Sequence, residues 1–286
     1  MSYKIILCEG DSWTAGDLLD PKLEERGITY INSPENDSYR LPKVWPNMLC
    51  EISNIKVLNT AVAGSSNDAI VRRSLNLVIN LLEEYKPEDI LVVIVWTSPE
   101  RKDFFYNDGV VHKRWETLYP AELYQKHISK ELQKFYELYV KYFWDVEEFS
   151  NRYIEQCLLI SNFLDGFGIK YYFFNAFYES SIEGYTNLYD KYFKNKVRGI
   201  PDERALEFYE ELTNLKGETD KVFFNEYRKI YNSHFLRISF KNFCDMIEAN
   251  RLVKFDNNHP SYKMHKEWSK YLHKQLLPPE GYFGSD

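Results

Sequence analysis

The feature that most constrains the fold is an apolar run at positions 90–96. It reads Ile-Leu-Val-Val-Ile-Val-Trp, and its apolar residues are continuous rather than alternating with polar ones. A strand with one face in water alternates, whereas a strand covered on both faces does not, and strands of the second kind belong to parallel sheets flanked by helices. This segment therefore predicts the central strand of an α/β protein.

The other apolar segments predict the rest of such a sheet and its covering helices. Further strands are expected at 3–8, 56–59 and 169–174, and helices at 68–85, about 121–164 and 262–277. Helices between successive strands make those strands parallel. We therefore expect a flavodoxin-like, three-layer α/β/α sandwich with a central parallel sheet.

The chain reads as one domain over residues 1–286. We find no internal repeat, no Gly/Ser-rich linker and no abrupt change of composition that would mark a boundary. Two segments do not fit a minimal sheet-and-helix domain. One at about 101–120 is rich in aromatic residues, and one at 179–233 is charged and rich in Tyr. We expect both to be helical insertions.

Composition excludes several classes of partner. The 36 Lys and Arg against 43 Asp and Glu give a net charge of −7, which argues against a nucleic-acid binder. No stretch reaches the ~20 apolar residues that a membrane span needs. The sequence starts without the pattern of a cleaved signal, so we expect a soluble protein that is cytoplasmic at synthesis.

The cysteines and histidines do not indicate a metal or another cofactor. The four cysteines lie far apart without a Cys-x-x-Cys pair, which favours free thiols in a reducing compartment. Five histidines have no spacing typical of a metal site; they are His112, His127, His234, His265 and His273.

The first candidate for chemistry is Gly10-Asp11-Ser12, directly after the first predicted strand. Ligands of open α/β sheets bind at the carboxyl edge of the strands, where this turn would present a Ser hydroxyl. The alternative is a plain strand-to-helix turn in which Asp11 or Ser12 caps the next residues.

The second candidate is Asp256 and His259, three positions apart near the other end of the chain. A Ser nucleophile needs a neutral imidazole to take its proton, and the imidazole needs an acceptor that fixes its orientation. The alternative is that Asp256 or Asn258 caps the helix that follows, with Pro260 in its first turn.

Together these blocks resemble the SGNH hydrolase family, also called GDSL esterases and lipases. The matching residues are Gly10, Asp11, Ser12 and Gly16 in the first block, Gly64 in the second, and Asp256 and His259 in the last. The resemblance implies that Ser12 is the nucleophile, His259 the base and Asp256 its orienting group. It also implies that the backbone N–H groups of Ser12 and Gly64 hold the oxyanion.

The third block departs from the family pattern, which has an Asn that donates to the oxyanion. After Trp96 this chain continues Thr97-Ser98-Pro-Glu-Arg. Thr97 or Ser98 could donate in place of the Asn, and so could Asn67. The alternative for Asn67 is that it caps the helix beginning near Asp68.

The variant third block also resembles a divergent SGNH branch associated with tailed phages. That resemblance implies O-acyl groups, usually acetyl, on carbohydrate as substrates. The aromatic residues of 104–119 would suit sugar rings, although they could equally pack on one another. The sequence thus predicts a serine esterase acting on a small-molecule or glycan ester, with no nucleic-acid or membrane partner. The alternative is a non-catalytic carbohydrate-binding or virion component that keeps the fold.

Overall fold

The structure, a computed structural model, describes residues 3–17, 34–107, 113–118, 129–143, 146–177, 226, 229–230, 232–236, 239–250 and 259–277. Its centre is a four-stranded sheet in the order β2-β1-β3-β6, with every neighbouring pair parallel. These strands are β1 (Ile5–Glu9), β2 (Lys56–Asn59), β3 (Ile90–Trp96) and β6 (Lys170–Asn175). The run at positions 90–96 forms the predicted central strand, and all seven of its residues are buried.

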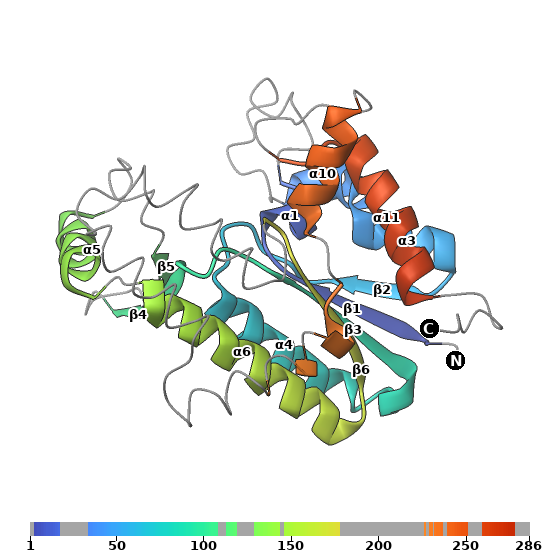
Figure 1. Cartoon of the computed structure of the whole chain (residues 1–286), viewed down its shortest axis with the longest axis horizontal. Helices are drawn as coiled ribbons and strands as arrows, with labels where there is room; N and C mark the ends of the chain where they lie inside the picture. The colour runs from blue at the N-terminus through green and yellow to red at the C-terminus, as the bar shows by residue number, and fades with distance from the viewer. Residues whose placement is uncertain are drawn as a thin grey trace.

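Helices cover both faces of this sheet (Figure 1). On one face lie α1 (Ser12–Ala15), α3 (Trp45–Ser53), α10 (Phe240–Ala249) and α11 (Tyr262–Leu276). On the other lie α4 (Asn67–Leu81) and α6 (Val146–Phe167). The shorter elements are α2 (Pro34–Arg40) and the 3-10 helices η1 (Leu41–Lys43) and η2 (Pro87–Asp89). The prediction of an α/β/α sandwich with a central parallel sheet is confirmed.

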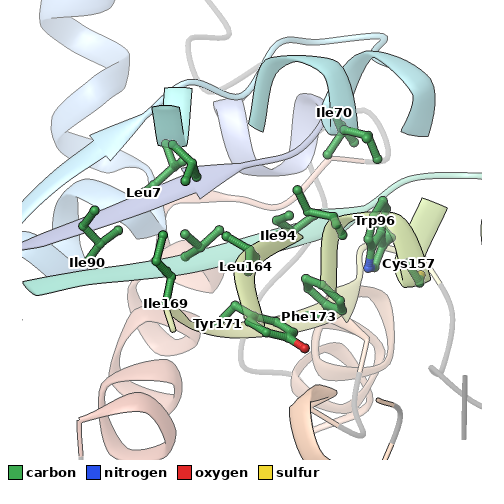
Figure 2. Close-up of a cluster of buried hydrophobic side chains, with 14 of the residues drawn as sticks. Leu7, Ile70, Ile90, Ile94, Trp96, Cys157, Leu164, Ile169, Tyr171 and Phe173 are labelled. Carbon is green, nitrogen blue, oxygen red and sulfur yellow. The ribbon is translucent and has the colours of Figure 1, made fainter. Parts of the chain in front are cut away.

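Alternate residues of β3 belong to two separate cores. Ile94 and Trp96 face α4 and α6, whereas Val93 and Val95 belong to the cluster beneath α3, α10 and α11. Figure 2 shows the first cluster, where Trp96 lies beside Phe173 of β6. Burial on both faces is the reason why the sequence of this strand is apolar without alternation.

The prediction that the first insertion is helical is wrong. Residues of 101–120 form an antiparallel hairpin of β4 (Lys102–Asn107) and β5 (Lys113–Leu118). Aromatic residues favour strands, and Phe105 and Trp115 face each other across the hairpin with ring centroids 5.4 Å apart. This cross-strand pair is a contact that a helix could not make.

The other long segments are only partly described. The stretch predicted as one helix at 121–164 contains two, α5 (Lys130–Tyr142) and α6. Nearly all of the second predicted insertion, 179–233, lies outside the described residues. Within the described ranges, no helix combines the length and the apolar character needed to cross a bilayer.

A buried carboxylate joins three elements at the end of β1. Glu9 is fully buried and accepts hydrogen bonds from the Arg73 guanidinium on α4, from the Thr60 hydroxyl at 2.7 Å and from the Gly10 N–H at 3.1 Å. Burial raises the pKa of Glu9, and Arg73 opposes that rise. The network ties β1, the loop after β2 and α4 together next to the Gly10-Asp11-Ser12 turn.

We predict that Arg73→Met lowers the free energy of unfolding by about 3 kcal/mol at neutral pH, because Glu9 is left buried without its cation. A carboxyl with a raised folded-state pKa contributes stability below its unfolded pKa and loses it as the pH rises through the folded value. The loss in Arg73→Met should therefore shrink on acidification to about pH 5. Urea unfolding of both proteins across this range measures it.

Lys4→Met is the matched control, since Lys4 pairs with Asp89 but its side chain is 65% exposed. Exposed pairs contribute only ~0 to 1 kcal/mol, so this variant should unfold almost as the wild type does. Equal losses in both variants, or a loss in Arg73→Met that does not change with pH, would contradict the prediction.

Candidate active site

The turn that carries Ser12 is built by the two residues before it. Gly10 has no room for a side chain, because an added Cβ would lie 2.6 Å from Thr14 Oγ1 and 3.0 Å from Val95 Cβ. Asp11 is the N-cap of α1, with its Oδ1 accepting from the Trp13 N–H at 3.1 Å. The capping alternative for Asp11 is therefore true, and it places Ser12 at the first position of the helix.

His259 lies against this turn although it follows Ser12 by 247 positions in the sequence. The distance from His259 Nε2 to Ser12 Oγ is 3.1 Å. That value is within the range of a nucleophile hydrogen-bonded to its base. The structure thus brings together two of the three predicted catalytic side chains, one from each end of the chain. Asp256 and Asn258 lie outside the described residues.

The position of His259 follows from the helix after it. Helix α11 begins at Tyr262 with Ser261 at its N-cap, so Pro260 does not lie in its first turn. The helix buries Met264, Trp268 and Leu272 against the sheet and α3. The N-cap position that the sequence offered to Asp256 or Asn258 is therefore held by Ser261, and His259 precedes a helix fixed by its apolar face.

Gly64 lies in the loop after β2, next to the turn that carries Ser12. Its φ of 75° is in the left-handed region that favours glycine. The Val62 N–H donates to the Gly10 carbonyl at 3.2 Å, which holds this loop against the end of β1. Within the described part of the chain, the N–H groups of Ser12 and Gly64 donate to no protein acceptor. Both N–H groups are the backbone donors that the motif resemblance implies for an oxyanion.

In the structure, the three side chains predicted as oxyanion donors are hydrogen-bonded to other protein groups. The Thr97 hydroxyl donates to Asp11 Oδ2 at 2.8 Å, and the Ser98 side chain hydrogen-bonds the Glu100 carboxyl. Asn67 accepts from the Thr97 N–H at 2.9 Å and donates to the Thr97 carbonyl at 3.2 Å. Buried carboxylates and backbone groups are strong partners for these side chains. The Thr97 hydroxyl hydrogen is therefore not available to an oxyanion.

Asn67 also does not cap the helix that it begins. Ser66 is the N-cap of α4, and its hydroxyl accepts from the Ala69 N–H at 3.1 Å. The Asn67 side chain is instead buried and clamped on both backbone groups of Thr97. This clamp fixes the end of β3 against the start of α4.

Aromatic rings surround the serine–histidine pair on one side. The ring of Trp13 packs edge-on to Phe177 at 4.9 Å and to Phe240 at 5.5 Å, and lies 6.4 Å from the His259 imidazole. These contacts hold the residue after Ser12 and give the imidazole an apolar neighbour.

The aromatic residues of the β4–β5 hairpin contact one another and α5, although Phe105 stays 56% and Trp115 50% exposed. Phe104 lies 4.8 Å from Phe135 and 5.2 Å from Tyr139 of α5. Trp115 contacts Phe105 and carries the Arg72 guanidinium 4.0 Å from its ring. The sequence left open whether these rings bind sugar or pack on one another, and these contacts favour packing on one another.

Two of the described histidines away from the site have local partners. His234 stacks on Tyr171 at 4.0 Å, and His265 is fully buried with its Nδ1 accepting from the Trp45 N–H at 3.2 Å. His112 and His127 lie outside the described residues. Among the residues that are described, no three His, Cys, Asp or Glu side chains gather as metal ligands would.

The fold and these side chains define an α/β/α sandwich protein with a Ser–His pair at the carboxyl edge of its parallel sheet. The chain belongs to the family described as "Family of unknown function (DUF6071)", which matches residues 29–192. No curated protein matches the chain.

The chain is similar to solved structures of lipolytic proteins and esterases, each of which has low sequence identity to it. A protein assigned to the lipolytic G-D-S-L family from Desulfitobacterium hafniense DCB-2 is 14% identical, with 95% of this chain and 98% of that chain covered and a TM-score of 0.43. A psychrotrophic esterase from Pseudoalteromonas sp. is 14% identical over 96% and 98%, with a TM-score of 0.41. A variant acetyl xylan esterase from Geobacillus stearothermophilus is 15% identical over 96% and 95%, with a TM-score of 0.40.

We predict that Asn67→Ala lowers the free energy of unfolding by about 2 to 4 kcal/mol, because a buried N–H and a buried carbonyl of Thr97 both lose their partner. Asn76→Ala is the control, since Asn76 is exposed on the same helix and its replacement should cost less than about 0.5 kcal/mol. Chemical denaturation measures both. Equal stabilities would show that the clamp does not hold the end of β3.

We also predict an acid-sensitive contribution from His265. Burial, with a smaller contribution from His259, lowers the pKa of His265 from 6.5 to about 3. Between these values the unfolded chain binds the additional proton, so the free energy of unfolding falls as the pH falls, by at most about 1.4 kcal/mol per pH unit. In His265→Asn, the amide oxygen can accept from the Trp45 N–H without titrating.

The stability of His265→Asn should therefore change less steeply than that of the wild type between about pH 6.5 and pH 4.5. His273→Asn, on the same helix but partly exposed, should keep the wild-type slope. Denaturant unfolding at several pH values measures the slopes. Parallel slopes in wild type and His265→Asn would contradict the assignment.

Proposed function

We propose that the protein is a serine esterase in which Ser12 is the nucleophile and His259 the general base. The observation that carries the proposal is the 3.1 Å distance between His259 Nε2 and Ser12 Oγ. A serine hydroxyl is a weak nucleophile unless an adjacent base takes its proton, and this pair has the geometry for that transfer. Asp256, three residues before His259, is proposed to orient the imidazole.

The proposed reaction has two halves. Ser12 Oγ forms a bond to the ester carbonyl carbon while its proton passes to His259 Nε2, and the carbonyl oxygen becomes an oxyanion beside the N–H groups of Ser12 and Gly64. The carbon–oxygen bond to the alcohol then breaks, and His259 returns the proton to the leaving oxygen. Water attacks the acyl-serine with His259 again as base, which releases the acid and restores Ser12.

The proposed substrate is an O-acetyl ester on a carbohydrate or small molecule. The motif resemblance supports it, and the net charge of −7 argues against a polyanion such as nucleic acid. No cofactor is needed for the proposed steps. A phage setting and residence in the cytoplasm or a virion stay predictions from the sequence.

The second candidate is a carbohydrate-binding protein that keeps the fold without efficient turnover. The observation that favours it is the Thr97 hydroxyl, which donates to Asp11 rather than toward a substrate. Loss of one oxyanion donor typically lowers turnover by ~10²- to 10³-fold. The two candidates differ in whether Ser12 is activated.

Labelling with a fluorophosphonate, followed by mass spectrometry of the modified peptide, tests the esterase. We expect labelling at Ser12, loss of labelling in Ser12→Ala, and a rate lower by at least ~10³-fold in His259→Ala, because nucleophile and base act as a unit. Ser38→Ala, an exposed serine on α2, is the control and should label as the wild type does.

Hydrolysis of p-nitrophenyl acetate should follow the same order in these variants, and acetylated oligosaccharides should release acetate. Folded wild-type protein that is not labelled but binds oligosaccharides would reject the esterase in favour of the binding protein. Labelling at a serine other than Ser12 would reject the assignment of the nucleophile.

A further inference from the structure

Arg101 contacts both loops that carry the proposed oxyanion donors. It follows the turn after β3, and its side chain is 12% exposed. Its Nη1 donates to the Ser65 carbonyl at 3.1 Å and lies 3.8 Å from Asp11 Oδ2. Asp11 immediately precedes Ser12, and Ser65 immediately follows Gly64. One guanidinium nitrogen therefore connects the two residues that flank the two N–H donors.

The contact between Arg101 and Asp11 also affects the charge next to Ser12. Asp11 is fully buried, and a carboxylate one residue from the nucleophile opposes the negative charge that develops on the carbonyl oxygen. Two hydrogen bonds, from Trp13 and Thr97, satisfy its oxygens without neutralising it. Arg101 is the cation within ion-pair distance of Asp11 among the described residues.

The position of Arg101 is itself fixed by its surroundings. The Arg152 guanidinium on α6 donates to the Pro99 carbonyl at 2.8 Å and to the Arg101 carbonyl at 3.3 Å. The Arg101 guanidinium also lies 5.9 Å from the ring of Phe177. Neighbouring Glu100 is buried, and desolvation raises its pKa although Arg101 and Arg152 oppose the rise. The turn therefore holds Arg101 toward Asp11 and Ser65.

We propose that Arg101 is a positioning residue of the oxyanion site, which sets the spacing of the Ser12 and Gly64 N–H groups and balances the charge of Asp11. The inference rests on the proposed esterase function. In the family that the motifs resemble, the third-block Asn stabilises the oxyanion directly as a donor. Here Arg101 stabilises it indirectly, by positioning the two backbone donors. Arg101 acts through Asp11 and Ser65 and does not itself contact the substrate.

Steady-state kinetics with p-nitrophenyl acetate test this role. Arg101→Gln should lower kcat by ~10- to 10²-fold with KM nearly unchanged, because the spacing of the donors affects the charged transition state more than the neutral ester. Arg101→Lys keeps the charge but not the forked geometry, and should retain an intermediate kcat. Lys102→Gln, which removes a cation paired with Glu148, is the matched control and should keep the wild-type kcat.

A double-variant cycle with Asp11→Asn tests the path of the effect. Asparagine keeps the N-cap of α1, and without the carboxylate Arg101 has less to balance. The kcat loss from Arg101→Gln should therefore be several-fold smaller in the Asp11→Asn background, since the two residues act on one contact. Melting temperatures of all variants identify any that do not fold, and Arg101→Lys then carries the comparison.

Four outcomes overturn the inference. Wild-type kcat in folded Arg101→Gln rejects the role of Arg101 while leaving the esterase intact, provided Ser12 is labelled. A rise in KM at constant kcat assigns Arg101 to substrate binding instead. Losses that multiply independently in the double variant reject the action through Asp11. Folded wild-type protein without Ser12 labelling rejects the esterase itself, and the inference with it.

Discussion

The arrangement of the site depends on one buried carboxylate, Glu9, at the end of β1. Its contacts with Arg73, Thr60 and the Gly10 N–H join the first strand to α4 and to the loop after β2. A buried charge is tolerated only when it is paired and hydrogen-bonded, so these three groups cannot separate without a large loss of stability. Because the next residues are Gly10, Asp11 and Ser12, this constraint fixes the turn that carries Ser12 relative to the loop that carries Gly64.

Much of the fold could be predicted from local sequence because burial leaves a local signal. The continuous apolar run of β3 and the apolar face of α11 are visible residue by residue, and their predicted bounds agree closely with the structure. The β4–β5 hairpin could not be predicted in this way. Its stability comes from a cross-strand pair, Phe105 with Trp115, and from Phe104 on α5. Both contacts join residues that are distant along the chain, so neither leaves a local apolar pattern.

The candidate site could likewise be predicted from local sequence only in part. The approach of Ser12 and His259 was predictable because each residue belongs to a short block with a recognisable neighbourhood. The role of Thr97 was not, because its hydroxyl partner, Asp11, is 86 residues away in the sequence, and Asn67, which clamps its backbone, is 30 residues away. Arg101 gave no signal at all, since a single arginine after a turn is ordinary in sequence and gains meaning only from Asp11 and Ser65 in space.

For the proposed esterase, Asp11 offers a reason why the third block can differ from that of the family that the motifs resemble. A threonine side chain is shorter than that of asparagine, and at position 97 it reaches the Asp11 carboxylate at 2.8 Å. The same carboxylate caps α1 through the Trp13 N–H and faces Arg101. The residue that stands where the resembled family has an oxyanion donor thus makes a contact that stiffens the turn carrying Ser12. Since preorganised donors stabilise a transition state without reorganising during the reaction, a rigid pair of backbone N–H groups can retain much of what three looser donors supply.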